Sequence, residues 1–283
     1  TIMVKVIGQQ RNKQAIDKWE RIPNFIIIEG SQGSGRKYLA RYICERFESD
    51  LVVMENKVDD IRDIIADSQL LNFDRVYIVD GSSMSIGAKN TLLKVTEEPP
   101  ANCHIVLTVN TMQQTLPTLV SRAQTLTMAP YTTEDYFEYL ESSKHVENTD
   151  MFNEYLKLIN SFGMLHTLVR NDISLYYTKV TNFLDNIWNV TFANALNITD
   201  WLKLKKKDEE DEEKLDPILF VNCVLNMFHA DCLLQQENST WDVLQQNKQF
   251  IQSTSKCLNY LNQKGRSKEI TLNTWLEEVT SIV

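Results

Sequence analysis

The sequence predicts an α/β domain with a parallel sheet and helices on both faces, followed by a small helical lid and an all-α C-terminal domain. Strand-like and helix-like segments alternate over residues 1–130, as in a parallel sheet with crossover helices. Strand signals nearly vanish from Tyr131 onward. A glycine-rich stretch between the first strand and the next helix has the build of a phosphate-binding loop. We therefore expect three domains, at residues 1–130, 131–172 and 173–283.

The first domain is expected to contain five strands, at residues 25–29, 51–54, 75–80, 104–109 and 124–127. Its helices are expected near residues 9–20, 36–47, 58–70 and 86–96. Two strands are continuous apolar runs, as burial on both faces of a sheet requires: Val76–Val79 and Ile105–Leu107.

The lid is expected to consist of helices at residues 133–143, 150–162 and 164–170, with a threonine N-cap at 132 or 133. Amphipathic helices are expected over residues 173–283. A charge run from Lys203 to Glu213 interrupts them. Such a run indicates a solvated loop or a frayed helix end, with a binding tail as the alternative. Pro217 then suits the first turn of a new helix.

The bulk composition narrows the class of protein. A net charge of −9 weighs against broad nucleic-acid binding by this chain alone. No run of eighteen apolar residues is present, so we expect no membrane span, and the first residues resemble neither a signal nor a transit peptide. The five cysteines include no Cys-x-x-Cys pair, which favours free thiols in a reducing cytoplasm.

The glycine-rich stretch keeps the shape of a phosphate-binding loop but changes its chemistry. Its glycines are Gly30, Gly33 and Gly35. Arg36 stands where the working pattern has Lys, and a planar guanidinium is a poor substitute for a compact ammonium beside phosphates. Lys37 stands where a Ser or Thr hydroxyl would ligate Mg²⁺. We therefore expect the loop geometry without the catalysis.

A second element of a nucleotide site would be a buried strand that ends in two acidic residues. Residues 76–80 supply the strand and Asp80, but the next residue is Gly81 and carries no carboxylate. Nothing at this point can orient a hydrolytic water. Asp80 alone is a weak signal, because strands often end in Asp as a turn former.

Several segments together resemble the AAA+ clamp-loader subunits. Ala88–Pro100 resembles their helix-and-loop signature, and Leu116–Arg122 resembles their Ser-Arg-Cys motif with alanine in place of Cys. Shorter likenesses lie at Val6–Gln10, at Asp59–Arg62 and at Ala129–Pro130. The resemblance covers about residues 4–170. With its broken nucleotide site, the chain is most similar to the non-hydrolysing delta-prime type of DNA polymerase III.

The resemblance implies roles for particular residues. Arg122, beside Ser121, would act in trans as an arginine finger on ATP held by a neighbouring subunit; a surface arginine paired with a local carboxylate is the alternative. Asn110 lies near the family's first sensor, although Thr108 could be that residue. Only His166 stands where the second sensor is an Arg, and a histidine packed between helices is the alternative.

The implied function is loading of a sliding clamp onto primer–template DNA, within a hetero-oligomeric ring of clamp-loader subunits and away from any membrane. The C-terminal helices would form part of its collar. Bacterial relatives often carry a four-Cys zinc module after the glycine loop; that insert is absent, so no zinc and no required cofactor is expected. ATP or ADP binding without hydrolysis stays open. The alternatives are a working ATPase that uses Lys37, and an AAA+-shaped adaptor outside replication.

Overall fold

The computed structural model describes residues 6–68, 72–143, 149–187, 215–235 and 240–282. These residues form two compact units. The first contains residues up to Tyr139 together with Ser161–Gly163, and the second contains Leu140–Asn160 and the chain from Met164 onward. The expected charge run at residues 203–213 lies outside the described residues. The three-domain division stays a prediction.

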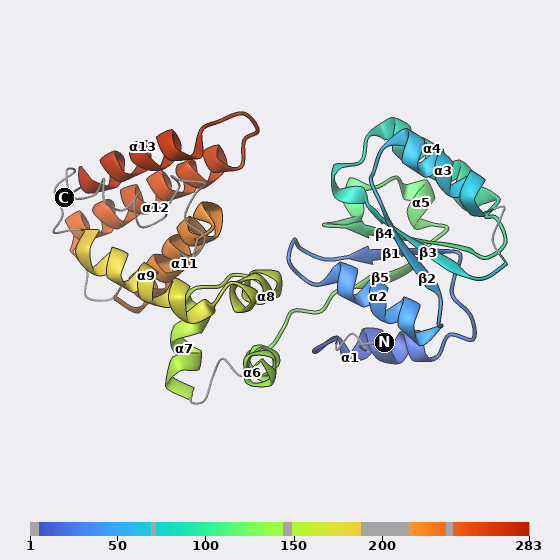
Figure 1. Ribbon diagram of the computed structural model, residues 1–283, viewed down its shortest axis with the longest axis horizontal. Helices are drawn as coiled ribbons and strands as arrows, with labels where there is room; N and C mark the ends of the chain where they lie inside the picture. Colours follow the sequence, from blue (N-terminus) through green and yellow to red (C-terminus); the bar gives the residue numbers. More distant parts are fainter. Residues whose placement is uncertain (1–5, 69–71, 144–148, 188–214, 236–239, 283) are drawn as a thin grey trace, which may run out of the picture. The chain divides into compact units, whose positions relative to one another are not determined.

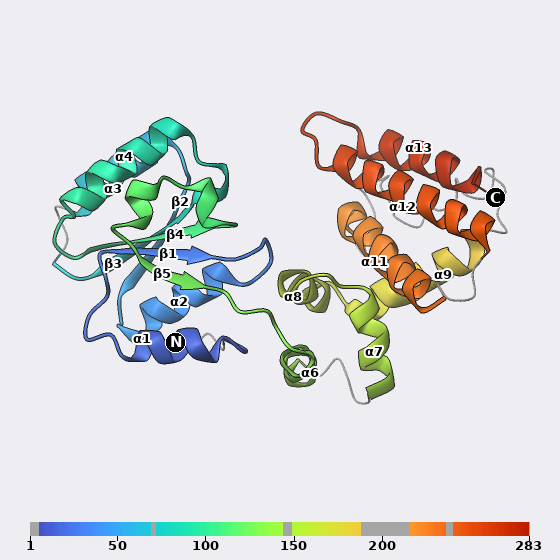
Figure 2. The ribbon, with the colours of Figure 1, turned by 180° about the vertical axis from the view of Figure 1, so that it is seen from behind.

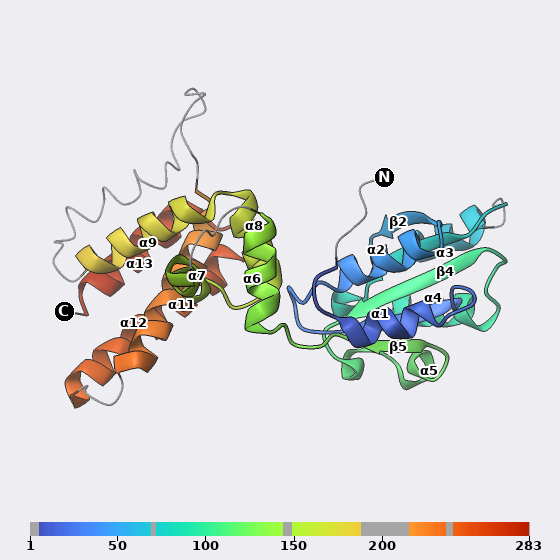
Figure 3. The ribbon, with the colours of Figure 1, turned by 90° about the horizontal axis from the view of Figure 1, so that it is seen from below.

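The first unit is built on one fully parallel sheet of five strands in the order β2-β3-β4-β1-β5 (Figures 1 and 3). The strands are β1 (Phe25–Glu29), β2 (Asp50–Met54), β3 (Arg75–Asp80), β4 (Cys103–Val109) and β5 (Gln124–Thr127). All five expected strands are present, within one residue of their expected bounds. The α/β prediction is confirmed.

Helices cover both faces of this sheet, as Figures 1 and 2 show. On one face lie α1 (Gln10–Asp17) and α2 (Arg36–Arg46), and on the other α3 (Val58–Ser68), α4 (Ile86–Glu97) and the short α5 (Pro117–Val120). Side chains of β1 point alternately to the two faces of the sheet. Ile26 and Ile28 pack with α1 and α2, whereas Phe25 and Ile27 pack with α3 and α4. Two 3₁₀ turns, η1 (Gly81–Ser83) and η2 (Met112–Gln114), follow β3 and β4.

One side chain joins the beginning of the first unit to the end of its sheet. The Gln9 amide donates to the carbonyl oxygen of Ala129 at 2.7 Å and accepts from the Ala129 N–H at 2.9 Å. Asn12 adds a bond to the carbonyl of Thr127 at 3.0 Å. The chain leaving β5 is therefore held against the start of α1.

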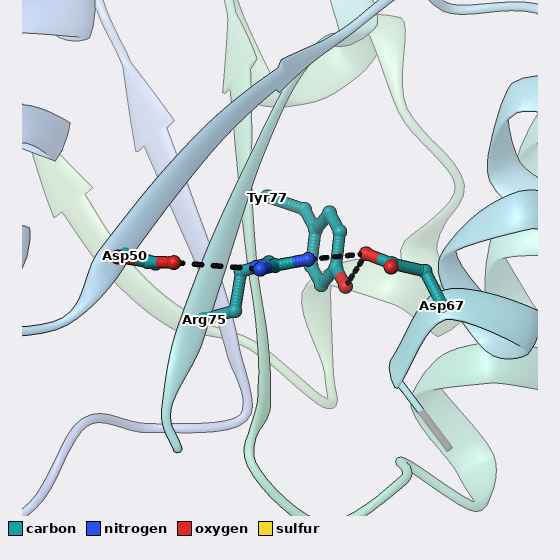
Figure 4. A network of polar contacts seen from close by, with 4 residues as sticks. All are labelled: Asp50, Asp67, Arg75 and Tyr77. Atoms are coloured by element: carbon teal, nitrogen blue, oxygen red, sulfur yellow. Dashed lines mark hydrogen bonds and ion pairs between the residues drawn. The ribbon is translucent and has the colours of Figure 1, made fainter. Parts of the chain in front are cut away.

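A polar network ties α3 to the sheet on its β2 side (Figure 4). Arg75 donates from Nη1 to Asp67 Oδ2 at 2.8 Å and from Nη2 to Asp50 Oδ2 at 3.4 Å. The Tyr77 hydroxyl donates to the same Asp67 oxygen at 2.6 Å. These donors lower the pKa of Asp67, the Tyr77 hydroxyl first and Arg75 second. Burial, reinforced by Asp67, raises the pKa of Tyr77.

Helices make up the rest of the described chain: α6 (Thr133–Ser142), α7 (Thr149–Lys157), α8 (Phe162–Arg170), α9 (Ile173–Ile187), α11 (Pro217–Gln235), α12 (Trp241–Leu261) and α13 (Lys268–Thr280). The expectation of a helix over 150–162 is wrong at its end. Helix α7 stops at Lys157, and α8 begins at Phe162, two residues before its expected start.

Among the described helices of the second unit, α11 is the most apolar, and it contacts α7, α9 and α12. Its residues Pro217–Leu234 have the length and composition of a membrane span, although the sequence led us to expect none. A core helix of a globular unit has the same composition, and Phe220, Val221, Cys223 and Val224 are buried here. Trp275 of α13 completes this core, with its ring stacked on Phe183 at 5.3 Å.

Candidate functional site

The glycine loop connects the end of β1 to the start of α2. Gly33 and Gly35 have φ of +80° and +84°, a region that only glycine adopts without strain. Gly35 is also the residue that caps α2. The N–H of Gly30 donates to the carbonyl of Val109 at 3.0 Å, which anchors the loop to the end of β4. The sequence thus predicted correctly a strand, a glycine turn and a helix in this order.

The two basic residues after the loop have different surroundings. Arg36 is half-buried, and its Nη1 has no hydrogen-bond partner among the described residues. Burial lowers the pKa of Arg36, and the negative charge of Asp80 opposes that shift. Lys37 is exposed. The structure therefore brings Arg36 and Asp80 under mutual electrostatic influence and leaves Lys37 in solvent.

The end of β3 has no room for a second acidic residue. Asp80 Oδ1 accepts from the N–H of Ser82 at 3.0 Å and so caps η1. A Cβ added to Gly81 would lie 2.9 Å from Leu107 Cδ1 and 3.0 Å from Val109 Cγ1. The missing carboxylate after Asp80 thus coincides with close packing against β4.

The candidate sensor residues differ in burial. Thr108 is fully buried and donates to the Val79 carbonyl at 3.5 Å, inside the sheet. Asn110 follows β4, and its Oδ1 is buried without a partner in the described part of the chain. Sequence reasoning missed Glu29, whose Oε1 accepts from the N–H of Met112 at 2.8 Å. Its place at a strand end, beside the glycine loop, was the signal that could have found it.

His166, the candidate in the second-sensor position, lies in α8 and is half-buried. Burial lowers its pKa, and the positive charge of Arg170 adds to that effect. The neutral imidazole is therefore favoured, which differs from the cation of an arginine sensor.

The residues present do not match a working Mg²⁺–ATP site. Position 37 offers an exposed ammonium in place of a hydroxyl, and Gly81 offers no carboxylate. Four of the buried polar atoms without a partner in the described residues belong to this edge of the sheet and its loops: Ser34 Oγ, Arg36 Nη1, Ser82 Oγ and Asn110 Oδ1. No group of three or more His, Cys, Asp or Glu within the described ranges is placed to hold a metal.

Arg122 lies on the surface, just after α5. Its Nη1 donates to the Thr118 carbonyl at 2.8 Å, and its Nη2 donates to Glu97 Oε1 at 3.1 Å. The side chains of Arg122 and Glu97 are 38% and 53% exposed. Ser121 is exposed and donates to the same Thr118 carbonyl at 3.1 Å. In the isolated chain, Arg122 thus has the local carboxylate partner of the alternative interpretation while remaining accessible.

The α/β unit has recognisable relatives. Residues 18–132 match the family model described as DNA polymerase III, delta subunit. A delta-prime subunit of DNA polymerase III from Haemophilus influenzae is 30% identical over 180 residues, which are 63% of this chain and 51% of that protein. The chain spans about half the length of this relative.

Solved structures show the same architecture over a larger part of the chain. A gamma subunit-related protein of DNA polymerase III from Thermotoga maritima has a TM-score of 0.57 at 18% identity, over 96% of this chain and 98% of its own. The RuvB Holliday junction branch migration motor of the same organism has a TM-score of 0.50 at 16% identity, over 84% and 85%. At these identities the similarity shows a shared fold alone.

Proposed function

We propose that this chain is a non-hydrolysing, delta-prime-like subunit of a cytoplasmic clamp loader of DNA polymerase III. In this proposal its partners are the other clamp-loader subunits and, through them, the sliding clamp and primer–template DNA. The match of residues 18–132 to the delta family supports the assignment. The altered loop at Arg36 and Lys37, with Gly81 after Asp80, supports the absence of ATP turnover on this chain.

The accessible Arg122 is the observation that carries the proposed role. Negative charge builds on the γ-phosphate as it is transferred, and a guanidinium from a neighbouring subunit stabilises it. Such arginine fingers accelerate hydrolysis by on the order of 10³–10⁵. Arg122 would supply this guanidinium to ATP bound by the neighbouring subunit, so the chain would accelerate ATP hydrolysis that it does not itself perform.

The surface pairing of Arg122 is compatible with this role. Ion pairs between exposed side chains contribute only about 0–1 kcal/mol, because water screens them. Glu97 is half-exposed, so Arg122 can exchange it for a more highly charged phosphate at little cost. Glu97 would then hold the guanidinium in place before the neighbouring subunit arrives.

The test is the ATPase rate of the complete assembly, reconstituted with the ATP-binding subunits of the same organism. Arg122→Ala is expected to lower the rate by about 10³ or more, and to leave the melting temperature of the isolated chain unchanged. Arg46→Ala is the matched control, because Arg46 is also a half-exposed arginine paired with a carboxylate, Asp17, at 3.6 Å. An unchanged ATPase rate in the Arg122→Ala assembly would remove the arginine-finger role.

A working ATPase on this chain is separated from the proposal by a second measurement. The purified chain is titrated with a fluorescent ATP analogue in the presence of Mg²⁺, and turnover is followed at saturation. The proposal predicts no turnover, whereas Mg²⁺-dependent binding followed by hydrolysis would overturn it.

A further inference from the structure

The glycine loop is covered by a short segment from far along the chain. Ser161–Gly163 belongs to the first unit, although the residues on either side of it belong to the second. The N–H of Gly163 donates to the carbonyl oxygen of Gly33 at 2.8 Å. A Cβ added to Gly163 would lie 2.8 Å from the Cα of Gly33, and one added to Gly33 would lie 2.6 Å from Ser161 Oγ. The two backbones thus touch where only glycine fits.

An aromatic cluster holds a second point of the loop. The Tyr131 hydroxyl donates to the Ser34 carbonyl at 3.1 Å, and a Cβ added to Gly35 would meet that hydroxyl at 2.7 Å. Phe162 stacks on the Tyr131 ring at 4.3 Å, with Tyr139 edge-on to Phe162 at 5.0 Å. Burial raises the pKa of Tyr131 to about 12, so its hydroxyl remains a neutral donor at physiological pH.

On the side that faces the covering segment, the loop presents the opposite polarity to the one that a phosphate needs. A phosphate-binding loop presents backbone N–H groups to its ligand. Here the carbonyl oxygens of Gly33 and Ser34 face Gly163 and Tyr131. The N–H of Ser34 is used inside the loop, where it donates to the Ser31 carbonyl at 3.1 Å. The side of the loop that faces the covering segment therefore offers acceptors, which repel an anion.

We propose that Tyr131 and Ser161–Gly163 form a latch that occupies the glycine loop and excludes the phosphate chain of a nucleotide from it. The latch deepens the proposed function, on which it rests, since it gives a physical reason for a subunit without its own ATP. It adds to the substitutions at Arg36 and Lys37, because it acts on the backbone of the loop and not on those side chains.

Hydrogen exchange of the full chain tests the latch directly. Gly163→Ala places a methyl group against the Gly33 backbone, and Gly87→Ala is the matched control. Each glycine is the second residue of its helix, but a Cβ on Gly87 would be 3.8 Å from its nearest contact, Val58. Gly163→Ala is expected to speed exchange of amides 33–36 by about tenfold, because the loop opens more often once the hydrogen bond from Gly163 to the Gly33 carbonyl and its packing are lost. Gly87→Ala is expected to leave them unchanged.

Tyr131→Phe is a milder variant that deletes only the hydroxyl, and it is expected to speed exchange of the same amides. Loop exchange that is unchanged in both latch variants would overturn the proposal. So would protection of amides 33–36 in the unmodified chain by millimolar Mg²⁺–ATP, because the loop would then be open to nucleotide. Neither result depends on Arg122, so the latch and the arginine finger can fail separately.

Discussion

The hydrogen bond between Tyr77 and Asp67 is expected to couple the sheet to α3 by about 1 kcal/mol. The perturbation is a double-mutant cycle with Tyr77→Phe and Asp67→Ala. The Tyr77 hydroxyl lies 2.6 Å from Asp67 Oδ2, and the same oxygen accepts from Arg75 at 2.8 Å (Figure 4). Tyr77 is only 1% exposed, whereas the Asp67 side chain beside Arg75 is 46% exposed.

The exposed fractions of Tyr77 and Asp67 determine the expected size of the coupling energy. A hydrogen bond to a charged group contributes about 1.5–3 kcal/mol when buried, and the exposure of Asp67 reduces this to about 1 kcal/mol. Tyr77→Phe is therefore expected to cost about 1 kcal/mol. Asp67→Ala is expected to cost about 2 kcal/mol, because it also removes the Arg75 ion pair and leaves the Tyr77 hydroxyl without its acceptor. The double variant should cost less than the sum of the two.

The assay is native-state hydrogen exchange of the buried amides of β3 and β4. It reports on the first unit alone, whereas global unfolding of a two-unit chain need not be two-state. Arg62→Ala is the control, since the Arg62–Asp59 pair on α3 is 66% and 87% exposed and should contribute under about 0.5 kcal/mol. Costs that add within about 0.3 kcal/mol would refute the coupling.

The pH dependence follows from the directions of the two pKa shifts. The pKa of Asp67 is lowered by folding, so its contribution is complete above the unfolded value of about 3.9 and is lost as pH falls through the lower folded value. The pKa of Tyr77 is raised, so its contribution is complete below about 10 and is lost as pH rises toward the folded value. The coupling should therefore be constant between about pH 5 and 9.

Two further substitutions test packing that the fold requires. Trp275→Ala is expected to destabilise the second unit by about 3–5 kcal/mol, because the buried indole stacks on Phe183 and donates to Thr254. Trp241→Ala is the control: this residue is 71% exposed, so its removal should shift the melting temperature little. Gly81→Asp restores an acidic pair but forces a Cβ against β4, so calorimetry should show a loss of stability of about 1–3 kcal/mol, with no gain in ATPase activity. A variant that hydrolyses ATP and keeps wild-type stability would contradict this explanation of Gly81.

The sequence predicted the sheet well because its strands carry strong local signals. Apolar runs such as Ile26–Ile28 and Val76–Val79 are buried on both faces, and turn residues bound them. Helix α5 was missed because four residues beginning with Pro117 are too short to show a helical period. The sheet order was also not predicted, since it depends on pairing between segments far apart in the chain.

The candidate site was predicted in part. The loss of particular functional groups could be predicted from single positions, as at Arg36, Lys37 and Gly81. The latch was not, because nothing local in Ser161–Gly163 reveals that it packs on a loop more than a hundred residues earlier. The end of the helix expected over 150–162 was also wrong because no local signal shows this contact. Helix α7 ends at Lys157, and the chain then leads to the Gly163 contact with the glycine loop. The ion pair between Arg122 and Glu97 was also not predicted, because the two residues lie in different sequence motifs and only the fold brings them together.

The order of the strands has a consequence for synthesis on the ribosome. The first strand to emerge, β1, pairs with β4 and β5, the last two, whereas β2 and β3 pair with each other. Its Phe-Ile-Ile-Ile run therefore stays without a neighbouring strand until residue 103 has been translated, and it gains its second partner only after residue 124. A nascent chain of this protein therefore exposes an apolar segment that is buried in the folded unit while the residues between β1 and β4 are translated, and exposed segments of this kind favour aggregation unless a chaperone binds them.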